Sequence, residues 1–123
     1  MIRVMVADDH PLVRCGLETV LDSAPDLVHC GSADRGDAAV RLALVARPDV
    51  LIIDVTMPGG DGIEATRVIR GALPDTRVIV LTWDLAAGGR AVAAGAEAFL
   101  LKDVDPIVLL AHIRAGVAPL LPR

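Results

Sequence analysis

Short apolar runs alternate with helical patterns along this chain, and the alternation limits the folds that it can adopt. Five runs look buried on both faces: about Arg3–Ala7, Leu27–Cys30, Val50–Ile53, Arg77–Leu81 and Ala98–Leu101. Runs of this kind, separated by helices, are typical of strands in a parallel sheet. Five such strands most often form a doubly wound sheet in the order 2-1-3-4-5, with helices on both faces. The sequence therefore predicts an α/β, flavodoxin-like fold.

The segments between these runs show helical periodicity. The predicted helices are one opened by Pro11, one capped by Ser32 or Asp34 and running through Ala46, Ile63–Arg70, Leu85–Ala94, and one capped by Asp105 and opened by Pro106. The last helix is expected to bury Ile107, Leu110 and Ile113. The fourth is the weakest, because its interior holds Gly88 and Gly89, and interior glycine costs about 1 kcal/mol relative to alanine.

Length and composition fit one folded domain inside the cell. The 123 residues are 54% hydrophobic and carry a net charge of −4 without a basic stripe, which argues against nucleic-acid binding by this segment. Two cysteines without metal-ligand spacing fit a reduced, cytoplasmic protein. No apolar run approaches the roughly 18 to 20 residues that span a bilayer. Gly116, Pro119 and Pro122 break the last helical pattern.

Polar side chains stand where four of the predicted strands end. Asp8 and Asp9 follow the first strand, Asp54 the third, Thr82 the fourth and Lys102 the fifth. In open α/β sheets the ligand crevice lies at the carboxyl ends of the strands. We therefore expect three carboxylates, a hydroxyl and an ammonium to meet in one small site.

The residue types at this site favour phosphoryl chemistry with a hard cation. Carboxylates about 5 Å apart repel by roughly 3 kcal/mol per pair at an effective dielectric near 20. Oxygen ligands favour Mg²⁺ as the neutralising ion. Asp54 can then act as a nucleophile that forms an acyl phosphate, with Lys102 and Thr82 stabilising the phosphoryl group. His10 is expected to be a solvated loop residue.

At this point the sequence resembles a known family, the receiver domains of bacterial two-component response regulators, over essentially its whole length. The matching segments are Val6-Ala7-Asp8-Asp9-His10-Pro11, Leu51 to Gly62 with Met57-Pro58-Gly59-Gly60-Asp61-Gly62, Val80-Leu81-Thr82, Gly95-Ala96, and Phe99-Leu100-Leu101-Lys102-Asp103. The first and last of these look like the NarL/FixJ class, whose output domain is a LuxR-type helix-turn-helix.

The resemblance implies a signalling domain rather than an enzyme. A sensor histidine kinase would phosphorylate Asp54, and the domain would take part in this phosphotransfer and in its own autodephosphorylation. Asp9, Asp54 and the main-chain carbonyl of Thr56 would ligate Mg²⁺, with Asp8 acting mostly through water. Thr82 and Phe99 would form the switch pair.

The resemblance also implies an organisation beyond the site. The receiver domain would cover residues 1–116, and residues 117–123 would begin a linker toward a DNA-binding domain that this chain does not include. The regulator would form a homodimer, and it would contact DNA only through that output domain.

Two departures from the class concern the pocket. Trp83 stands where a small residue is usual, so its ring is expected to crowd the access to Asp54, with Asp84 as a second modulating residue. The stretch from Thr82 to Gly95 is about two residues short, which predicts that either the loop after Thr82 or the fourth helix is trimmed. Both departures would suit a degenerate receiver that acts as a phosphorylation-independent interaction or dimerisation domain.

Two readings from other classes are weaker. A haloacid-dehalogenase-like phosphatase also uses a strand-end aspartate and Mg²⁺. That class usually has a general acid/base two residues after the nucleophile, where this chain has Thr56. Asp8 and His10 on such a fold also suggest a cobalamin-binding module. That class has a glycine three residues after the histidine, where this chain has Val13. Phosphate-ester turnover would reveal the first, and a visible absorption spectrum the second.

Overall fold

The computed structural model describes residues 1–115, so the predicted linker, 117–123, lies outside the described residues. Five parallel strands form one sheet in the order β2-β1-β3-β4-β5. Their bounds are β1 Ile2–Ala7, β2 Leu27–Ala33, β3 Val50–Asp54, β4 Arg77–Thr82 and β5 Ala98–Leu101. This order confirms the fold predicted from the alternation of apolar runs.

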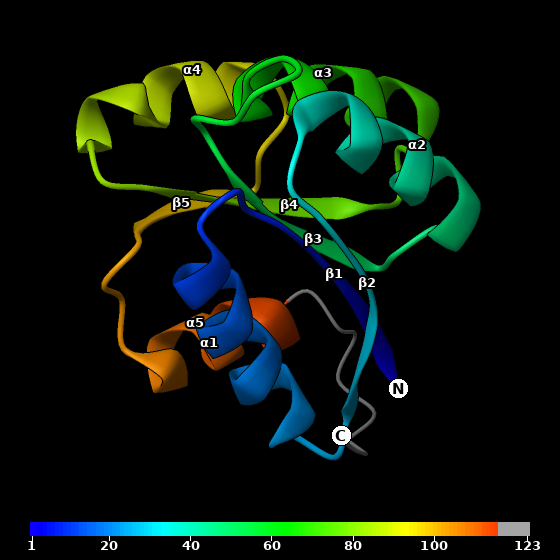
Figure 1. Cartoon of the computed structure of the whole chain (residues 1–123), viewed down its shortest axis with the longest axis vertical. Coiled ribbons are helices and arrows are strands. Elements are labelled where there is room, and N and C mark those ends of the chain that lie inside the picture. Colours follow the sequence, from blue (N-terminus) through cyan, green and yellow to red (C-terminus); the bar gives the residue numbers. More distant parts are fainter. Residues whose placement is uncertain (116–123) are drawn as a thin grey trace, which may run out of the picture.

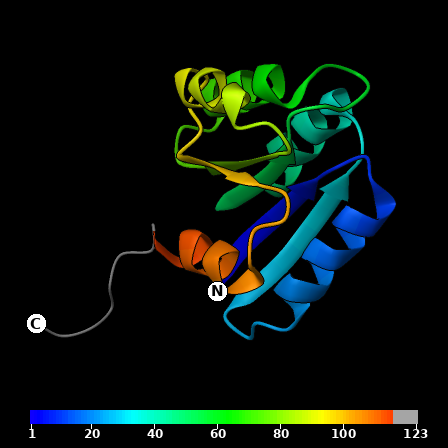
Figure 2. The ribbon, with the colours of Figure 1, turned by 90° about the vertical axis from the view of Figure 1, so that its left-hand side faces the viewer.

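Helices cover both faces of the sheet (Figure 1). Their bounds are α1 Pro11–Asp22, α2 Gly36–Ala46, α3 Gly62–Ala72, α4 Gly88–Ala93 after the 3₁₀ turn η1 Leu85–Ala87, and α5 Pro106–Ala115. The helices α2, α3 and α4 lie on one face, and α1 and α5 lie on the other, as the turned view in Figure 2 also shows. Among the described residues, no helix is both long enough and apolar enough to cross a bilayer.

The sheet separates two apolar cores. Every residue of β3 is buried, in agreement with its place in the middle of the sheet. Alternate strand residues face opposite layers: Leu51 and Ile53 pack toward α2, α3 and α4, whereas Val50 and Ile52 pack toward α1 and α5. The strands are thus fixed from both sides, and their carboxyl ends are held at one edge.

The start of α2 differs from the prediction. The helix begins at Gly36, and neither Ser32 nor Asp34 caps it; the preceding residue, Arg35, makes no side-chain cap. Ser32 lies within β2, which runs three residues further than predicted, and its hydroxyl donates to the Glu18 carboxylate at 2.6 Å. The amide of Gly36 instead donates to the carbonyl of Pro58, so a distant loop satisfies this helix end.

The face that α5 buries also differs from the prediction. Ile113 is buried as predicted, but Ile107 is 76% exposed, Leu110 is only partly covered, and Leu109 is buried in their place. Leu109 and Ile113 are four residues apart and share one side of the helix, from which Ile107 points away.

The weak fourth helix is confirmed as short. Where one helix over Leu85–Ala94 was predicted, the chain forms a 3₁₀ turn and then only six α-helical residues.

Candidate functional site

Three charged side chains from three strand ends meet at the carboxyl edge of the sheet. Asp8 follows β1, Asp54 ends β3 and Lys102 follows β5, and all three side chains are almost completely buried. The Nζ atom of Lys102 lies 3.1 Å from Oδ2 of Asp8 and 2.9 Å from Oδ2 of Asp54. The predicted convergence of these residues is therefore present, with the ammonium bridging two carboxylates.

The strand register accounts for this convergence. Ala7 pairs with Ile53, and Asp54 pairs with Leu81, so β1, β3 and β4 reach the same edge together. The amide of Lys102 donates to the carbonyl of Thr82, which continues the pairing of β4 with β5 past its last residue. Each polar residue thus lies at the last position of its strand or directly after it.

His10 is an exposed loop residue, as the sequence indicated, but its ring also lies beside this cluster. Its side chain is 55% exposed, but Nδ1 lies 3.2 Å from Oδ1 of Asp8, 3.2 Å from Oδ1 of Asp9 and 3.9 Å from Oδ2 of Asp54. One possible ligand atom from each of these four residues lies within 4.8 Å of the other three. The only signal in the sequence was the position of His10 directly after the two acids, and this does not fix the direction of the ring.

Burial makes the charge on Asp54 costly. Desolvation raises the pKa of its carboxyl group, and the negative charge of Asp8 raises it further. The nearby Lys102 ammonium lowers this pKa, as does the amide of Thr56, which donates to Oδ1 at 3.3 Å. The net shift is upward, so one ammonium does not fully compensate the buried acids.

The oxygen atoms at this edge fit a divalent cation. Oδ2 of Asp8, Oδ1 of Asp9 and Oδ2 of Asp54 are buried without a hydrogen-bond partner, although Lys102 is within ion-pair distance of two of them. Buried polar atoms normally have partners. The three carboxylates form an oxygen-rich donor set that suits Mg²⁺.

The predicted switch and modulating residues lie at the ends of β4 and β5. The hydroxyl of Thr82 donates to the carbonyl of Asp84 and accepts from its amide, both at 3.0 Å, so it is directed to the backbone of its own loop. Asp84 caps η1 by accepting from the amide of Ala86 at 2.9 Å. Phe99 is partly buried, and Trp83 is 62% exposed. The roles assigned to these residues, and the crowding expected from Trp83, stay predictions.

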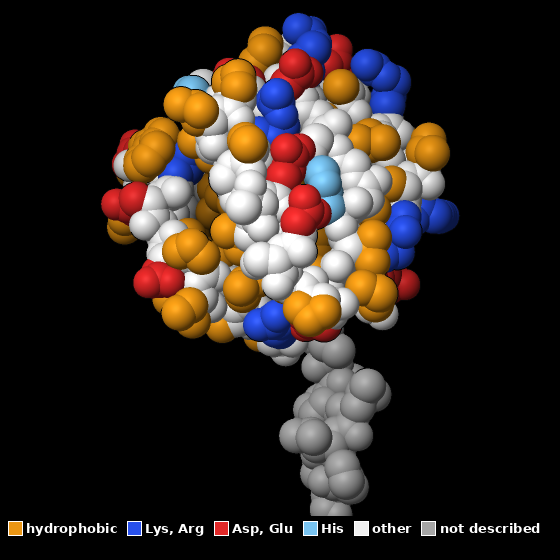
Figure 3. All heavy atoms as spheres, turned by 60° about the horizontal axis from the view of Figure 1, so that its bottom comes forward, with side chains coloured by type: hydrophobic (Ala, Val, Ile, Leu, Met, Phe, Trp, Pro, Cys, Tyr) orange, Lys and Arg blue, Asp and Glu red, His pale blue; other side chains and the backbone are white. Residues whose placement is uncertain are grey.

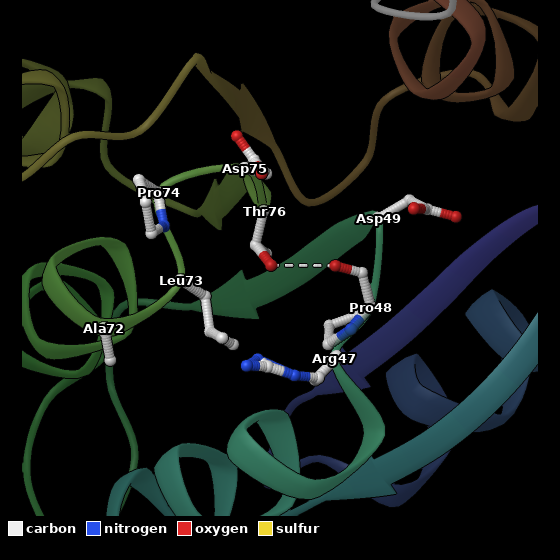
Figure 4. Close-up of a pocket in the computed structure, with 8 residues that line it drawn as sticks. All are labelled: Arg47, Pro48, Asp49, Ala72, Leu73, Pro74, Asp75 and Thr76. Atoms are coloured by element: carbon white, nitrogen blue, oxygen red, sulfur yellow. Dashed lines mark hydrogen bonds between the residues drawn. The ribbon is translucent and has the colours of Figure 1, made fainter.

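Two further hollows in the described structure contain none of the acids of this cluster, although Lys102 lines the second. One cavity of about 300 Å³ lies at the opposite end of the sheet, where β3 and β4 begin, and Figure 4 shows Arg47 and Leu73 on its walls. The hydroxyl of Thr76, which lines this cavity, donates to the carbonyl of Pro48. This hydrogen bond joins the two loops that precede β3 and β4. The other is a groove of about 360 Å³ between α1 and α5. Figure 3, which brings this side of the molecule forward, shows hydrophobic side chains distributed among charges of both signs.

The comparisons with known proteins agree with this geometry. The family model of the response regulator receiver domain matches residues 4–114. The transcriptional regulatory protein LiaR of Bacillus subtilis is 43% identical over 118 residues, which cover 94% of this chain and 56% of LiaR. The nitrate/nitrite response regulator NarP of Escherichia coli is 37% identical over 93% of this chain and 54% of its own length.

Solved structures show the same relationship. A LuxR-family two-component response regulator from Aurantimonas sp. SI85-9A1 superposes with a TM-score of 0.87 and 35% identity, covering 94% of this chain and 84% of that one. The receiver domain of the NarL-type regulator from Mycobacterium tuberculosis gives 0.84 and 34%, covering 92% and 96%. The chain belongs to the response regulator receiver family, and its relatives are of the NarL/LuxR type. It spans about half the length of the regulators LiaR and NarP.

Proposed function

We propose that Asp54 accepts a phosphoryl group from the phosphohistidine of a sensor kinase, and that this modification controls the output of a longer regulator. The observation that supports this most strongly is the buried Asp54 carboxylate, 2.9 Å from the Lys102 ammonium and beside two further acids. A carboxylate held in this way has a charge partner for the incoming phosphoryl group already in place.

In the proposed transfer, an oxygen of Asp54 attacks phosphorus. The new O–P bond forms while the P–N bond of the phosphohistidine breaks, and the imidazole leaves with the electrons of that bond. Lys102 stays close enough to neutralise the phosphoryl oxygens. Asp9, Asp54 and the main-chain carbonyl of Thr56 would hold Mg²⁺, with Asp8 acting through water, and the ion would supply further positive charge to the same oxygens.

The response of the domain would begin at Thr82 and Phe99. Phosphorylation would draw the Thr82 hydroxyl from the Asp84 backbone toward the new phosphoryl group, and the Phe99 ring would turn inward. A shift of α4 would require little free energy, because this helix has only six residues. Hydrolysis of the acyl phosphate by water in the same site would end the signal.

The wider role rests on the relatives. LiaR is a transcriptional regulatory protein, and NarP is a response regulator for nitrate and nitrite. By analogy, a DNA-binding domain following the linker would carry the output, and the regulator would act as a homodimer in the cytoplasm. The receiver itself would not contact DNA.

Intact-mass measurement after treatment with acetyl phosphate and Mg²⁺ tests the phosphoacceptor. The wild-type protein should gain one phosphoryl group, and Asp54→Asn should gain none. Asp61→Asn is a matched control, because Asp61 caps α3 outside the cluster and asparagine can also cap. Equal labelling of the Asp54→Asn variant would contradict the assignment.

A further inference from the structure

We propose that His10 is a fourth protein ligand of the cation at this site, so that the receiver binds nitrogen-preferring divalent cations such as Ni²⁺ and Co²⁺ through an imidazole as well as carboxylates. This inference rests on metal binding by the proposed site, but not on phosphorylation.

The spacing of the ligand atoms supports the proposal. Nδ1 of His10 lies 3.2 Å from Oδ1 of Asp8 and 3.2 Å from Oδ1 of Asp9. Metal–ligand bonds of about 2.0 to 2.2 Å place neighbouring ligands of one octahedral ion about 3 Å apart. The imidazole nitrogen therefore lies from each of these two oxygens at a distance close to that between neighbouring ligands of one ion.

The charge of the cluster calls for a divalent ion. Three carboxylates and the one Lys102 ammonium leave two uncompensated negative charges. Lys102 contacts Asp8 and Asp54 and lies 3.4 Å from Nδ1 of His10, whereas Oδ1 of Asp9 is buried without a hydrogen bond, 3.2 Å from the same Nδ1. A cation between Asp9 and His10 would satisfy this oxygen and balance the charge.

The loop holds His10 in place for this role. Its amide donates to Oδ1 of Asp8 at 2.8 Å, and Pro11 begins α1 directly after it. The backbone on both sides of the ring is thus constrained. Because the ring is half exposed, a cation bound there would keep open positions toward solvent.

An imidazole ligand changes the metal preference of an otherwise oxygen-only site. Mg²⁺ prefers oxygen ligands, whereas imidazole suits Ni²⁺ and other late first-row metals. Removing the ring should therefore weaken Ni²⁺ and Co²⁺ binding more than Mg²⁺ binding. A histidine that lies nearby without ligating would show no such difference.

Calorimetric titration of Mg²⁺, Co²⁺ and Ni²⁺ into the wild-type protein, His10→Ala and His112→Ala tests this. His112 lies on α5, far along the chain from the cluster, and serves as a matched histidine control. We expect His10→Ala to lose at least about tenfold more affinity for Ni²⁺ than for Mg²⁺. His112→Ala should match the wild type, and Asp9→Asn should weaken all three ions. An unchanged Ni²⁺ to Mg²⁺ affinity ratio in His10→Ala would overturn the proposal.

A spectroscopic measurement on the wild-type protein gives an answer even if His10→Ala folds poorly. Pulsed electron paramagnetic resonance with bound Cu²⁺, a late first-row ion that imidazole suits, should show nitrogen hyperfine coupling from a directly bound imidazole. Bound Cu²⁺ without nitrogen coupling, or no binding of Ni²⁺, Co²⁺ or Cu²⁺, would also overturn it. Failure here leaves the mass test of Asp54 with Mg²⁺ unaffected, so the two proposals fail separately.

Discussion

The ring of Phe99 fills the space that any larger side chain at position 88 would need. A Cβ atom added to Gly88 would lie 2.3 Å from both Cε2 and Cζ of Phe99. Gly88 begins α4 and Phe99 lies in β5, so this contact ties the position of the short helix to that of the ring. The sequence marked Gly88 as a source of helix weakness; the structure shows that it is also a packing requirement.

Gly88→Ala should therefore destabilise the protein, although alanine is the better helix former. The added methyl group displaces the ring, and overpacking of this kind costs typically about 1 to 3 kcal/mol. Against this stands a gain of up to about 1 kcal/mol in helix propensity. We expect a net loss of about 1 kcal/mol, measured by urea unfolding.

Gly89→Ala is the matched control, because Gly89 lies in the same helix and a Cβ there would contact nothing within 4 Å. This variant should gain about 0.5 to 1 kcal/mol. In a Phe99→Ala background the Gly88→Ala change should also cease to be harmful. Equal effects of the two glycine substitutions would show that the ring does not restrict position 88.

The sequence was informative about the sheet and the acids because both depend on local patterns. Apolar runs predict strands, and a polar residue at the end of a buried parallel strand must emerge at the edge that the strands share. Asp8, Asp54 and Lys102 were placed together on this basis alone.

The structure differs from the prediction, or adds to it, where contacts between distant parts of the chain or a side-chain rotamer determine the local arrangement. In α5 every residue from Ile107 to Leu110 is apolar, so the pattern cannot tell which side of the helix faces the sheet. The start of α2 depends on a carbonyl from Pro58, more than twenty residues away. The contact of His10 with the acids depends on a side-chain rotamer, which no sequence pattern encodes.

Asp54→Asn should stabilise the metal-free protein at pH 7. Burial raises the pKa of Asp54, so the folded protein holds its proton more tightly than the unfolded chain does. The stability linked to that proton is present below the ordinary pKa and is lost as the pH rises through the raised value. At pH 7 the wild type therefore carries the cost of a buried charge, which asparagine removes.

We expect a gain in unfolding free energy in EDTA, and the gain is limited because Lys102 loses one of its two carboxylate partners. The gain should shrink as the pH falls toward 4. Urea unfolding at pH 7 and 4.5, with Asp61→Asn alongside, measures it. A variant that is less stable than the wild type in EDTA at pH 7 would contradict the burial argument.

Arg77 should contribute more to stability than its carboxylate partner. It donates to the carbonyls of His112 and Ile113 at 2.7 and 2.8 Å, and it pairs with both oxygens of Glu97. Arg77→Ala leaves the end of α5 without these donors, and we expect a loss of about 2 kcal/mol. Glu97→Gln should cost less than about 1 kcal/mol, because Glu97 is 44% exposed and solvent screens the pair.

The Glu97 contribution should also depend on pH. The hydrogen bonds from Arg77 lower the pKa of Glu97, so its stabilising effect is present above the ordinary value of 4.5 and is lost as the pH falls through the lowered value. Unfolding of the wild type and of Glu97→Gln should therefore converge in acid. A difference that grows in acid would exclude this assignment.

Trp83 offers a direct test of access to the phosphoacceptor. The ring is 62% exposed and follows Thr82, whose hydroxyl is bound to the backbone of Asp84. If the ring obstructs the approach of small donors, Trp83→Ala removes a barrier of about 0.5 to 1 kcal/mol, which corresponds to a roughly two- to fivefold faster reaction. The rate of Asp54 labelling by acetyl phosphate, followed by intact mass, measures this effect.

Leu85→Ala is the control for Trp83→Ala, because Leu85 is an exposed apolar residue of the same connection between β4 and α4. It should leave the labelling rate unchanged, since the argument concerns the ring beside Thr82 and not the apolar character of the connection. A faster reaction in both variants would point to loosening of the whole connection. An unchanged or slower reaction in Trp83→Ala would show that the exposed ring leaves the path to Asp54 open.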